Sequence, residues 1–264
     1  GSLPNVLGIR KEQNYLILLQ NPHEIRPTGG FIGSYALLTL ENGKIKNLTI
    51  DDIYNPDGQI DTRQIISPVP APIKKFLSEN ILHIRNANWS PDFPKSAESI
   101  EELFFKLDGS SFDGVVALDL NTIQSLLKVT GPVFLAAYNE EINADNLYER
   151  TQYHAEFDYQ EGISEKRSFL TILSGKLLEK IFALPPQDFS KFILAISDSL
   201  NSRSLQIYLK DPLLASFLTQ KKWNGKLDDT QGDFLMIVNS NLGGTKANYF
   251  VKNNYEYSVS SDTR

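Results

Sequence analysis

The order of sequence patterns predicts an α/β (α+β) fold, with a mixed, largely antiparallel central sheet and helices on both of its faces, three layers in all. Strand-like segments separated by turns open the chain, over residues 15–20, 35–40 and 45–50. From residue 96 onward, apolar residues at helical spacing alternate with short strand-like runs. The chain has 264 residues and is 41% hydrophobic, so it is long and apolar enough to bury the core of such a fold.

The first three strands are predicted to be antiparallel neighbours. Residues 41–44, Glu-Asn-Gly-Lys, have the composition of a tight turn between the second and third strands. Residues 51–72 are rich in Asp and Pro and show little periodicity, so we predict a long loop, in the manner of a functional lid. A short helix is predicted within residues 71–80.

The middle of the chain predicts a helix followed by a crossover. Ser96 is placed to cap this helix. Its apolar residues share one face and are expected in the core: Ala97, Ile100, Leu103, Phe104 and Leu107. A strand over 113–118, a helix through 123–127 and a strand after Gly131-Pro132 then follow in the order of a crossover unit.

The last part of the chain predicts further helices and strands. Helices are expected over 143–153, 164–184 and 189–200, and strands over 205–209, 233–239 and 249–259. Asp211-Pro212 supplies an N-cap and a first-turn proline for one more short helix. The apolar run Phe234–Val238 has the composition of a buried strand.

We predict one domain over residues 1–264. Gly1-Ser2 has the form of an expression-tag remnant, and residues 249–264 are expected to lead, as a strand, into a following part of the protein. No apolar run reaches the length of a membrane span, so any membrane anchor is expected upstream of these residues.

Composition excludes several classes of function. The sequence has no cysteine, which excludes thiol nucleophiles, disulfides and thiolate metal sites. A net charge of -6 argues against a general nucleic-acid surface, which would need a basic stripe. No G-x-S-x-G motif is present, so a serine hydrolase is set aside.

The segment Arg26–Ser34 is the most informative part of the sequence. Its glycines allow sharp bends and a close approach of the backbone to a ligand or another chain, and Arg26 favours phosphate or carboxylate. We predict an anion site here, with a hairpin turn carrying a surface arginine as the alternative. Because such an arginine is not expected in the core, Arg26→Ala should abolish ligand affinity without unfolding the protein.

Charged residues next to other predicted loops extend this hypothesis. Asp51 and Asp52 end a strand, where paired carboxylates can hold Mg²⁺ bridging a pyrophosphate. Arginines and a lysine elsewhere would share the remaining phosphate charge: Arg26, Arg85, Arg150, Lys166 and Arg167. Each of them taken alone is typical of a surface charge.

The order of these segments resembles a bacterial domain of unknown function, number four thousand and twelve in the usual series. The resemblance rests on segments spread over nearly the whole chain: residues 15–21, 26–35, 88–94, 113–119, 127–133 and 239–251. More remotely, the sequence is similar to the LytR-CpsA-Psr proteins, membrane-anchored enzymes that move glycopolymers from a polyprenyl pyrophosphate carrier onto the cell wall. This resemblance implies a LytR-CpsA-Psr-like fold.

Several positions correspond to motifs of that enzyme family. Arg26-Pro27-Thr28 resembles an Arg-Ser-Asp motif, and Ile50-Asp51-Asp52 resembles a Pro-Arg-Asp motif. Residues 147–150 and 165–170 resemble paired arginines and the helix that follows them. Thr28 stands where the relatives have a metal-binding aspartate, and Asp51 where they have a phosphate-binding arginine, so one metal ligand and one cation are missing.

The resemblance implies an extracytoplasmic, membrane-anchored protein of the cell envelope that binds a polyprenyl (pyro)phosphate-linked glycan or an anionic lipid, with no nucleic-acid partner. A catalytic role is implied for Arg26, Asp52, Arg85, Arg150 and Arg167. Substrate binding is expected at Thr28, Gly29, Gly30, Asn88, Trp89 and Lys166. Asp51 and Asp52 would hold Mg²⁺.

Three functions stay open: phosphotransfer of the glycan, non-catalytic binding or scaffolding, and an interaction domain whose strand at residues 249–259 pairs with another segment. A geometric criterion separates the first two. Convergence of Asp52 and at least three arginines on an apolar tunnel favours the transferase, and their scatter favours the binding domain.

Overall fold

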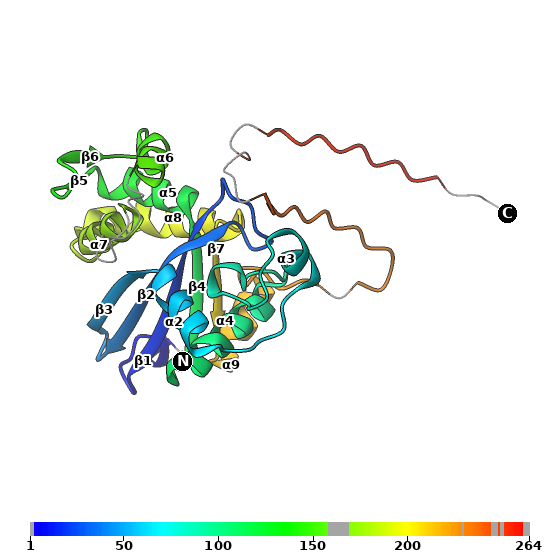
Figure 1. The fold of residues 1–264 in the computed structure, drawn as a ribbon. Helices are drawn as coiled ribbons and strands as arrows, with labels where there is room; N and C mark the ends of the chain where they lie inside the picture. The colour runs from blue at the N-terminus through cyan, green and yellow to red at the C-terminus, as the bar shows by residue number, and fades with distance from the viewer. Residues whose placement is uncertain (1–2, 158–168, 229, 244–247, 249–250, 261–264) are drawn as a thin grey trace.

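The computed structural model describes residues 3–157, 169–228, 230–243, 248 and 251–260. A five-stranded sheet with the order β3-β2-β1-β4-β7 forms its centre (Figure 1). Its strands are β1 (Gln13–Asn21), β2 (Phe31–Glu41), β3 (Lys44–Asp52), β4 (Gly114–Asp119) and β7 (Leu205–Leu209). All neighbouring strands are antiparallel except β1 and β4, which are parallel. The predicted fold class is therefore confirmed.

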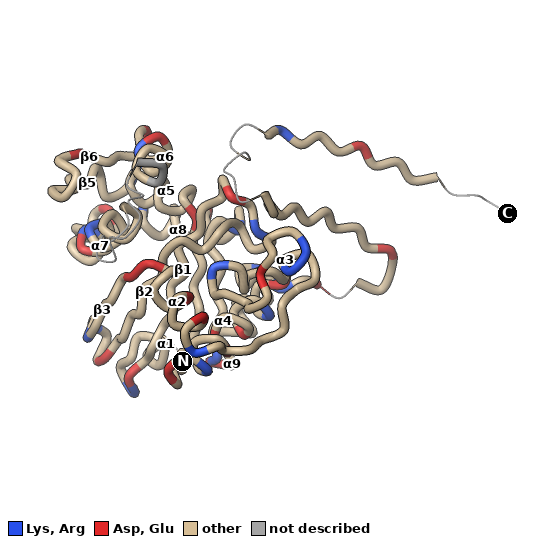
Figure 2. The backbone as a smooth tube through the Cα atoms, in the orientation of Figure 1, with Lys and Arg blue, Asp and Glu red and all other residues tan. Residues whose placement is uncertain are grey.

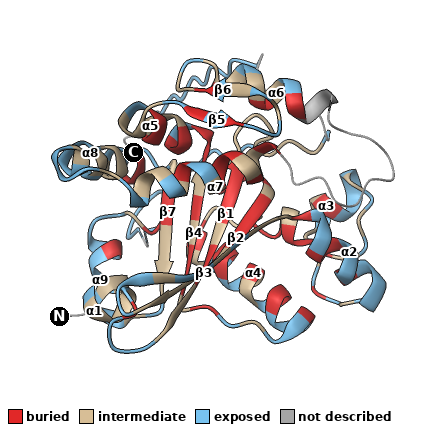
Figure 3. Ribbon diagram, turned by 90° about the vertical axis from the view of Figure 1, so that its left-hand side faces the viewer, coloured by how far each residue is buried: buried red, intermediate tan, exposed pale blue. Residues whose placement is uncertain are grey.

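Helices cover both faces of this sheet (Figures 1 and 3). One face carries α2 (Tyr54–Arg63), α3 (Ala71–Phe76), the 3-10 turn η1 (Ile84–Asn86) and α4 (Phe93–Asp108). The other face carries α5 (Leu120–Thr130), α7 (Phe169–Phe182) and α8 (Phe189–Asn201). The remaining elements are α1 (Leu3–Val6), the hairpin β5 (Val133–Leu135) and β6 (Glu140–Ile142), α6 (Leu147–Phe157), η2 (Pro186–Asp188) and α9 (Pro212–Gln220).

Helix α4 is the main helical contribution to the first core cluster. The predicted apolar face is confirmed, since Ala97, Ile100 and Leu103 are buried against the sheet together with Phe104 and Leu107. The predicted cap is wrong, because the side chain of Asp92 accepts the Lys95 amide hydrogen bond. Ser96 is instead fully buried, and its hydroxyl donates to the Ser90 carbonyl (2.8 Å).

The predicted crossover after β4 is corrected by the strand pairing. β5 follows α5 as expected, but it pairs with β6 in a separate two-stranded sheet and not with the central sheet. The parallel neighbour of β4 is β1. A second core cluster lies between α5, this hairpin, α6 and α7, and includes Ile123, Leu135 and Leu173.

The predicted loop over residues 51–72 contains a helix, α2. Pro56 lies in its first turn, where the backbone amide has no helical partner, so this proline does not break the helix. Ile53 and Ile60 are fully buried. Burial of these two side chains outweighs the local composition that predicted a loop.

The strands predicted over residues 233–239 and 249–259 are not found among the described residues. Within the described part of residues 230–260, the chain is largely extended and pairs with no strand, and much of it projects from the body, while Asn241 hydrogen-bonds to Ile25 (Figure 1). The run Phe234–Val238 is solvent-exposed and not buried. A continuous apolar run is buried only where a neighbouring surface covers it, and the described residues leave most of this run uncovered.

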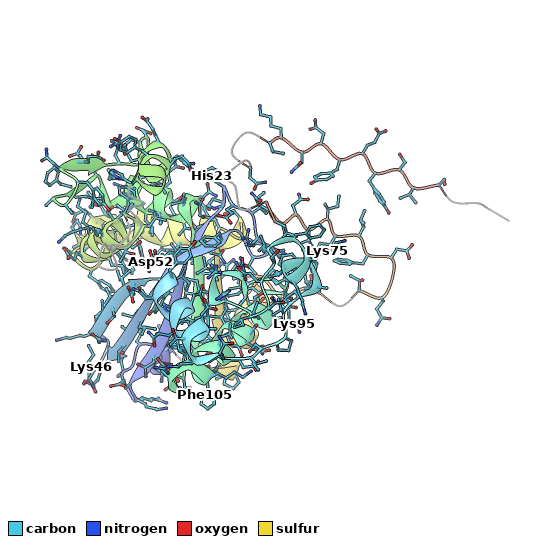
Figure 4. All side chains as sticks on the ribbon, viewed as in Figure 1. His23, Lys46, Asp52, Lys75, Lys95 and Phe105 are labelled. Carbon is cyan, nitrogen blue, oxygen red and sulfur yellow. The ribbon has the colours of Figure 1, made fainter. Side chains whose placement is uncertain are left out.

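We predict that Leu103→Ala lowers the free energy of unfolding by about 2–5 kcal/mol, because Leu103 is 1% exposed and its removal leaves a cavity under α4. Phe105→Ala on the same helix, at a side chain 64% exposed (labelled in Figure 4), should change stability by less than about 1 kcal/mol. Urea unfolding measures both. Equal losses would contradict the assigned face of α4.

Candidate functional site

The glycine-rich turn folds back tightly against the end of β1. Gly29 has a backbone φ of 132°, and a Cβ there would lie 2.8 Å from Oε1 of Gln20. A Cβ on Gly30 would lie 2.2 Å from the carbonyl oxygen of Asn21. The hydroxyl of the buried Thr28 accepts hydrogen bonds from Gln20 Nε2 (2.8 Å) and Asn88 Nδ2 (2.9 Å). The sequence therefore places glycines where no side chain fits.

The outer side of this turn forms one wall of an open pocket of about 410 Å³. The pocket lies at the carboxyl ends of the parallel strands β1 and β4, a place where α/β proteins commonly bind ligands. Its lining residues are Pro27, Thr28, Gly29, Pro91, Asp119, Asn121, Ser202, Arg203, Ser204, Gln206 and Met236.

Polar groups from α5 and β7 fill the opposite wall. Asp119 caps α5 and accepts from the backbone amides of Asn121 (2.9 Å) and Thr122 (3.1 Å). Burial raises the pKa of Asp119, and these hydrogen bonds oppose the rise. Gln206 donates from Nε2 to the Thr28 carbonyl (2.6 Å), which ties β7 to the glycine-rich turn.

Arg203 supplies the cation of this pocket. It precedes β7 in a left-handed backbone conformation (φ 61°), and its side chain is exposed. In the part of the chain that the structure describes, no carboxylate forms an ion pair with its guanidinium. The guanidinium is thus available to an anionic group in the pocket.

Arg26 lies beneath the turn and is only 2% exposed, so the expectation of a surface side chain is wrong. All three guanidinium nitrogens donate hydrogen bonds. Nε donates to Asn86 Oδ1 (3.0 Å), Nη1 to the Asn241 carbonyl (2.8 Å) and Nη2 to Glu24 Oε1 (3.0 Å). These partners satisfy the guanidinium inside the protein, so Arg26 has a structural role in holding the glycine-rich turn.

Arg85 belongs to a second buried ion-pair network, which Asn86 connects to Arg26. The Arg85 guanidinium contacts Asp57 Oδ2 (3.0 Å) and Glu79 Oε1 (2.8 Å). His83 lies between Glu79 Oε2 (3.1 Å) and Asp61 Oδ1 (2.9 Å). Burial alone would raise the pKa of Glu79, but hydrogen bonds from His83, Arg85 and Asn86 and the charge of Arg85 lower it to about 2.

Arg150 lies on α6, in the lobe that also holds β6. Its Nε donates to Glu140 Oε2 (2.9 Å), and its guanidinium lies over the Tyr153 ring (4.6 Å). The hydrogen bond from Arg150 lowers the pKa of Glu140. Lys166 and Arg167 lie outside the described residues.

Asp51 and Asp52 do not form a shared chelate. They are consecutive residues of β3, so their side chains leave opposite faces of the sheet, beside Tyr35 and Ser34 respectively. Asp52 Oδ1 accepts the Tyr54 amide (2.9 Å) at the end of β3, where Figure 4 labels it. Burial raises the pKa of Asp52, the Tyr54 amide opposes the rise, and the charge of Asp51 adds to it.

Asp51 and Asp52 do not come together as the paired ligands that were predicted for Mg²⁺. Mg²⁺ requires several oxygen ligands in octahedral geometry. Among the described residues, no group of three or more His, Asp or Glu is arranged to hold a metal ion.

The structure brings only part of the predicted substrate-binding set to the pocket. Thr28 and Gly29 line it. Asn88 is fully buried and holds the turn through the Gly30 carbonyl (2.8 Å), and Trp89 packs against the core. Sequence reasoning missed Asp119, Asn121, Arg203 and Gln206. The signal for Asp119 was available, because it ends a strand and precedes a helix at a cap position.

Positively and negatively charged residues alternate along the described part of the chain. Figure 2 shows Lys and Arg interspersed with Asp and Glu along the chain. None of the helices in the described ranges is long and apolar enough to cross a membrane.

Several solved structures are similar to this chain at low sequence identity. Similar solved structures include protein gbs0355 from Streptococcus agalactiae (14% identity, TM-score 0.47, covering 84% of this chain and 76% of that chain) and Lin1025 from Listeria innocua (12%, 0.41, 81% and 79%). TagV from Bacillus subtilis, a LytR-CpsA-Psr protein, also matches (11%, 0.39, 82% and 80%). These likenesses concern the fold, and no function is carried over from them.

The family follows from the sequence. The family described as Protein of unknown function (DUF4012) matches residues 10–155, more than half of the 264-residue chain. The chain belongs to this family, which confirms the resemblance inferred from its segments. No curated protein matches the sequence.

The buried position of Arg26 generates a stability prediction. Arg26→Met should lower the free energy of unfolding by about 3–5 kcal/mol, because it leaves Glu24 and the Asn86 and Asn241 oxygens without their donor. Arg10→Met, at an exposed arginine, should have little effect. Urea unfolding checks both. An unchanged free energy of unfolding in Arg26→Met would contradict the structural role of Arg26 and leave only a ligand-binding role for it.

The low pKa of Glu79 generates a pH prediction. A carboxyl group whose pKa is about 2 in the folded protein and 4.5 when unfolded stabilises the fold above pH 4.5 and loses this contribution as the pH falls toward 2. Glu79→Gln should therefore flatten the loss of stability across this range. Glu102→Gln, at an exposed surface pair, is the control. If the free energy of unfolding fell equally between pH 4.5 and 2 in the wild type and in Glu79→Gln, this ion-pair network would not account for the acid sensitivity.

Proposed function

We propose that this chain is a non-catalytic domain of a cell-envelope protein whose pocket binds the polar part of a polyprenyl (pyro)phosphate-linked glycan. The observation that carries the proposal is the pocket itself. The predicted substrate-binding residues Thr28 and Gly29 form a wall of it, opposite the exposed Arg203. The pocket thus combines a close backbone approach with an available cation.

The pocket lining suits a sugar joined to an anion. Asp119, Asn121 and Gln206 offer carboxylate and amide groups to hydroxyls. Pro27, Pro91 and Met236 offer apolar surface to the C–H faces of a ring. The volume of about 410 Å³ lies in the ordinary range of small-molecule sites.

The arginines explain why we infer binding and not transfer. Arg26 pairs with Glu24, Arg85 with Asp57 and Glu79, and Arg150 with Glu140. Each guanidinium is paired with carboxylates, Arg26 and Arg85 in networks that Asn86 connects and Arg150 on α6, and none of the three lines the pocket. The described arginines do not converge, which by the geometric criterion favours the binding domain.

The ligand class rests on the sequence resemblance to the LytR-CpsA-Psr proteins. The same resemblance supports the further parts of the proposal: a place outside the cytoplasmic membrane, a membrane anchor and a role connected with cell-wall glycopolymers. As a binding domain, it would hold the lipid-linked glycan for another protein.

We expect calorimetry to detect saturable binding of a polyprenyl pyrophosphate that carries a short glycan, with weaker binding of the bare carrier. Arg203→Gln should weaken the affinity about tenfold, the effect of losing one charge-assisted hydrogen bond of about 1.4 kcal/mol. Arg10→Gln, at an exposed arginine near the start of β1, is the matched control.

Two results would overturn the proposal. One is the absence of binding for both the glycan-bearing and the bare carrier. The other is binding that Arg203→Gln and Arg10→Gln leave equally unchanged, since the ligand would then lie outside this pocket. Transfer of the glycan to an acceptor by the wild-type chain would reinstate the enzyme hypothesis.

A further inference from the structure

His83 lies in a cluster of charged side chains between α2 and η1. Its Nε2 atom lies 2.9 Å from Oδ1 of Asp61 on α2, and its Nδ1 atom lies 3.1 Å from Oε2 of Glu79, which precedes η1. The His83 side chain is only 8% exposed. Because each ring nitrogen faces a carboxylate oxygen, both contacts are hydrogen bonds only when both nitrogens carry a proton. This geometry is that of the charged imidazolium.

The surrounding charges also favour a protonated ring. The charged groups that face it come from α2, from the segment before η1 and from η1 itself: Asp57, Asp61, Glu79 and Arg85. Among the described residues that face the ring, three carboxylates thus meet one guanidinium, and an imidazolium supplies a second positive charge. β2 also packs against η1, but its carboxylate, Glu41, ends the strand and pairs with Lys46.

A neutral ring cannot keep both carboxylate contacts, because it donates from one nitrogen only. The tautomer with its proton on Nε2 keeps the contact with Asp61. In this tautomer Nη2 of Arg85, which lies 3.0 Å from Nδ1, can donate to Nδ1. The Nδ1 lone pair then faces Glu79 Oε2 and repels it. The Nδ1 atom therefore has two alternative partners, Glu79 when the ring is charged and Arg85 when it is neutral.

Glu79 connects the His83 ring to the glycine-rich turn. Nδ2 of Asn86 donates to both carboxylate oxygens of Glu79, at 3.2 Å each. Oδ1 of the same Asn86 accepts from Nε of Arg26 (3.0 Å), the arginine that holds the turn. A continuous series of hydrogen bonds thus runs from His83 through Glu79 and Asn86 to Arg26. Through this series, a change at the ring can alter a pocket wall that His83 does not line.

We propose that His83 is a proton-sensitive switch for the glycine-rich turn. When the ring is charged, Glu79 is held between His83 and Asn86, and Asn86 is oriented to accept from Arg26. When the ring is neutral, Glu79 turns away from His83, Asn86 loses a fixed partner, and the turn is released from its position against β1.

The switch operates near neutral pH. Burial alone would lower the pKa of His83, but hydrogen bonds to Glu79 and Asp61 raise it above its ordinary value of 6.5, with Arg85 opposing the rise and Asp57 adding to it. A group whose pKa is raised on folding stabilises the folded arrangement fully below its unfolded pKa, here 6.5, and loses this contribution as the pH rises through its folded pKa. The turn is therefore held at pH 6.5 and below, and it is released at higher pH.

The test is a pH titration of the whole chain by nuclear magnetic resonance, without ligand. The chain has three histidines, so the ring signals of His83 are assigned by their loss in His83→Gln. We expect the ring to titrate above pH 6.5 and the amide signals of Gly29 and Gly30 to shift with the same midpoint. In His83→Gln the glycine signals should no longer titrate in this range.

Asp61→Asn tests the switch in a chain that keeps His83 and its series of hydrogen bonds to Arg26. Removing one carboxylate from the ring should lower the midpoints of the ring and the glycine signals together, by at least about 0.5 pH unit. Glu102→Gln is the matched control, because Glu102 is also an exposed carboxylate in an ion pair, 57% exposed against 55% for Asp61. It should leave both midpoints unchanged.

Three results would overturn the proposal. One is a pair of glycine signals that does not follow the His83 ring. Another is a set of midpoints that Asp61→Asn leaves in place. The third is a neutral ring whose nitrogen signals place the proton on Nδ1, because Glu79 would then keep its donor.

Control of ligand binding by this switch rests on the proposed function. The affinity for the lipid-linked glycan should fall as the pH rises through the His83 midpoint, and Asp61→Asn should move this fall to lower pH. Affinity that stays constant while the glycine signals titrate would overturn this control. An absence of binding at every pH would overturn the proposed function alone, because the titration of the ring and the turn needs no ligand.

Discussion

The burial of the Arg26 guanidinium is the interaction on which the candidate site depends. It joins Glu24 beside the turn, Asn86 on η1 and the carbonyl of Asn241 in the C-terminal segment. A buried arginine is stable only when its donors are satisfied, so these segments must be in place together. They hold the glycine-rich turn against β1, and the turn in turn shapes the pocket wall.

The described arginines differ in role: some are paired with carboxylates of the fold, and Arg203 lines the pocket. The pairs of Arg85 and Arg150 are largely internal, and Asn86 links the network of Arg85 to that of Arg26. Arg203 differs because it is an exposed lining residue of the pocket and forms no ion pair with a carboxylate among the described residues. The proposed binding of an anion needs less concentrated positive charge than the transfer of a phosphoryl group does.

The two outer edges of the central sheet, at β3 and at β7, have opposite physical characters. Lys44 and Lys46 protect the β3 edge of the sheet, whereas a groove of about 350 Å³ lies beside the β7 edge. The Asn241 amide donates a hydrogen bond to the Ile25 carbonyl, and this bond fixes where the chain returns to the body after the apolar run. The two edges of one sheet thus differ in their chemistry.

The sequence alone determined the elements whose signals are local. Helical spacing identified the buried face of α4, the strand β7 was predicted at Leu205–Leu209, and Asp211-Pro212 predicted the start of α9. Periodicity and capping depend on neighbours within a few residues, so one sequence suffices to read them. The family resemblance likewise rests on short segments in a fixed order.

Tertiary structure decided what depends on distant partners. Arg26 is buried because Asn86 and Asn241 lie 60 and 215 residues further along the chain, and no local pattern contains them. Burial of Ile53 and Ile60 made a helix of a segment with loop composition, and the lack of a covering surface left Phe234–Val238 exposed. The pocket likewise combines the turn with Asp119 and Arg203 from two other elements. Local patterns specify which conformation a segment prefers, but only the folded chain specifies which surface it meets.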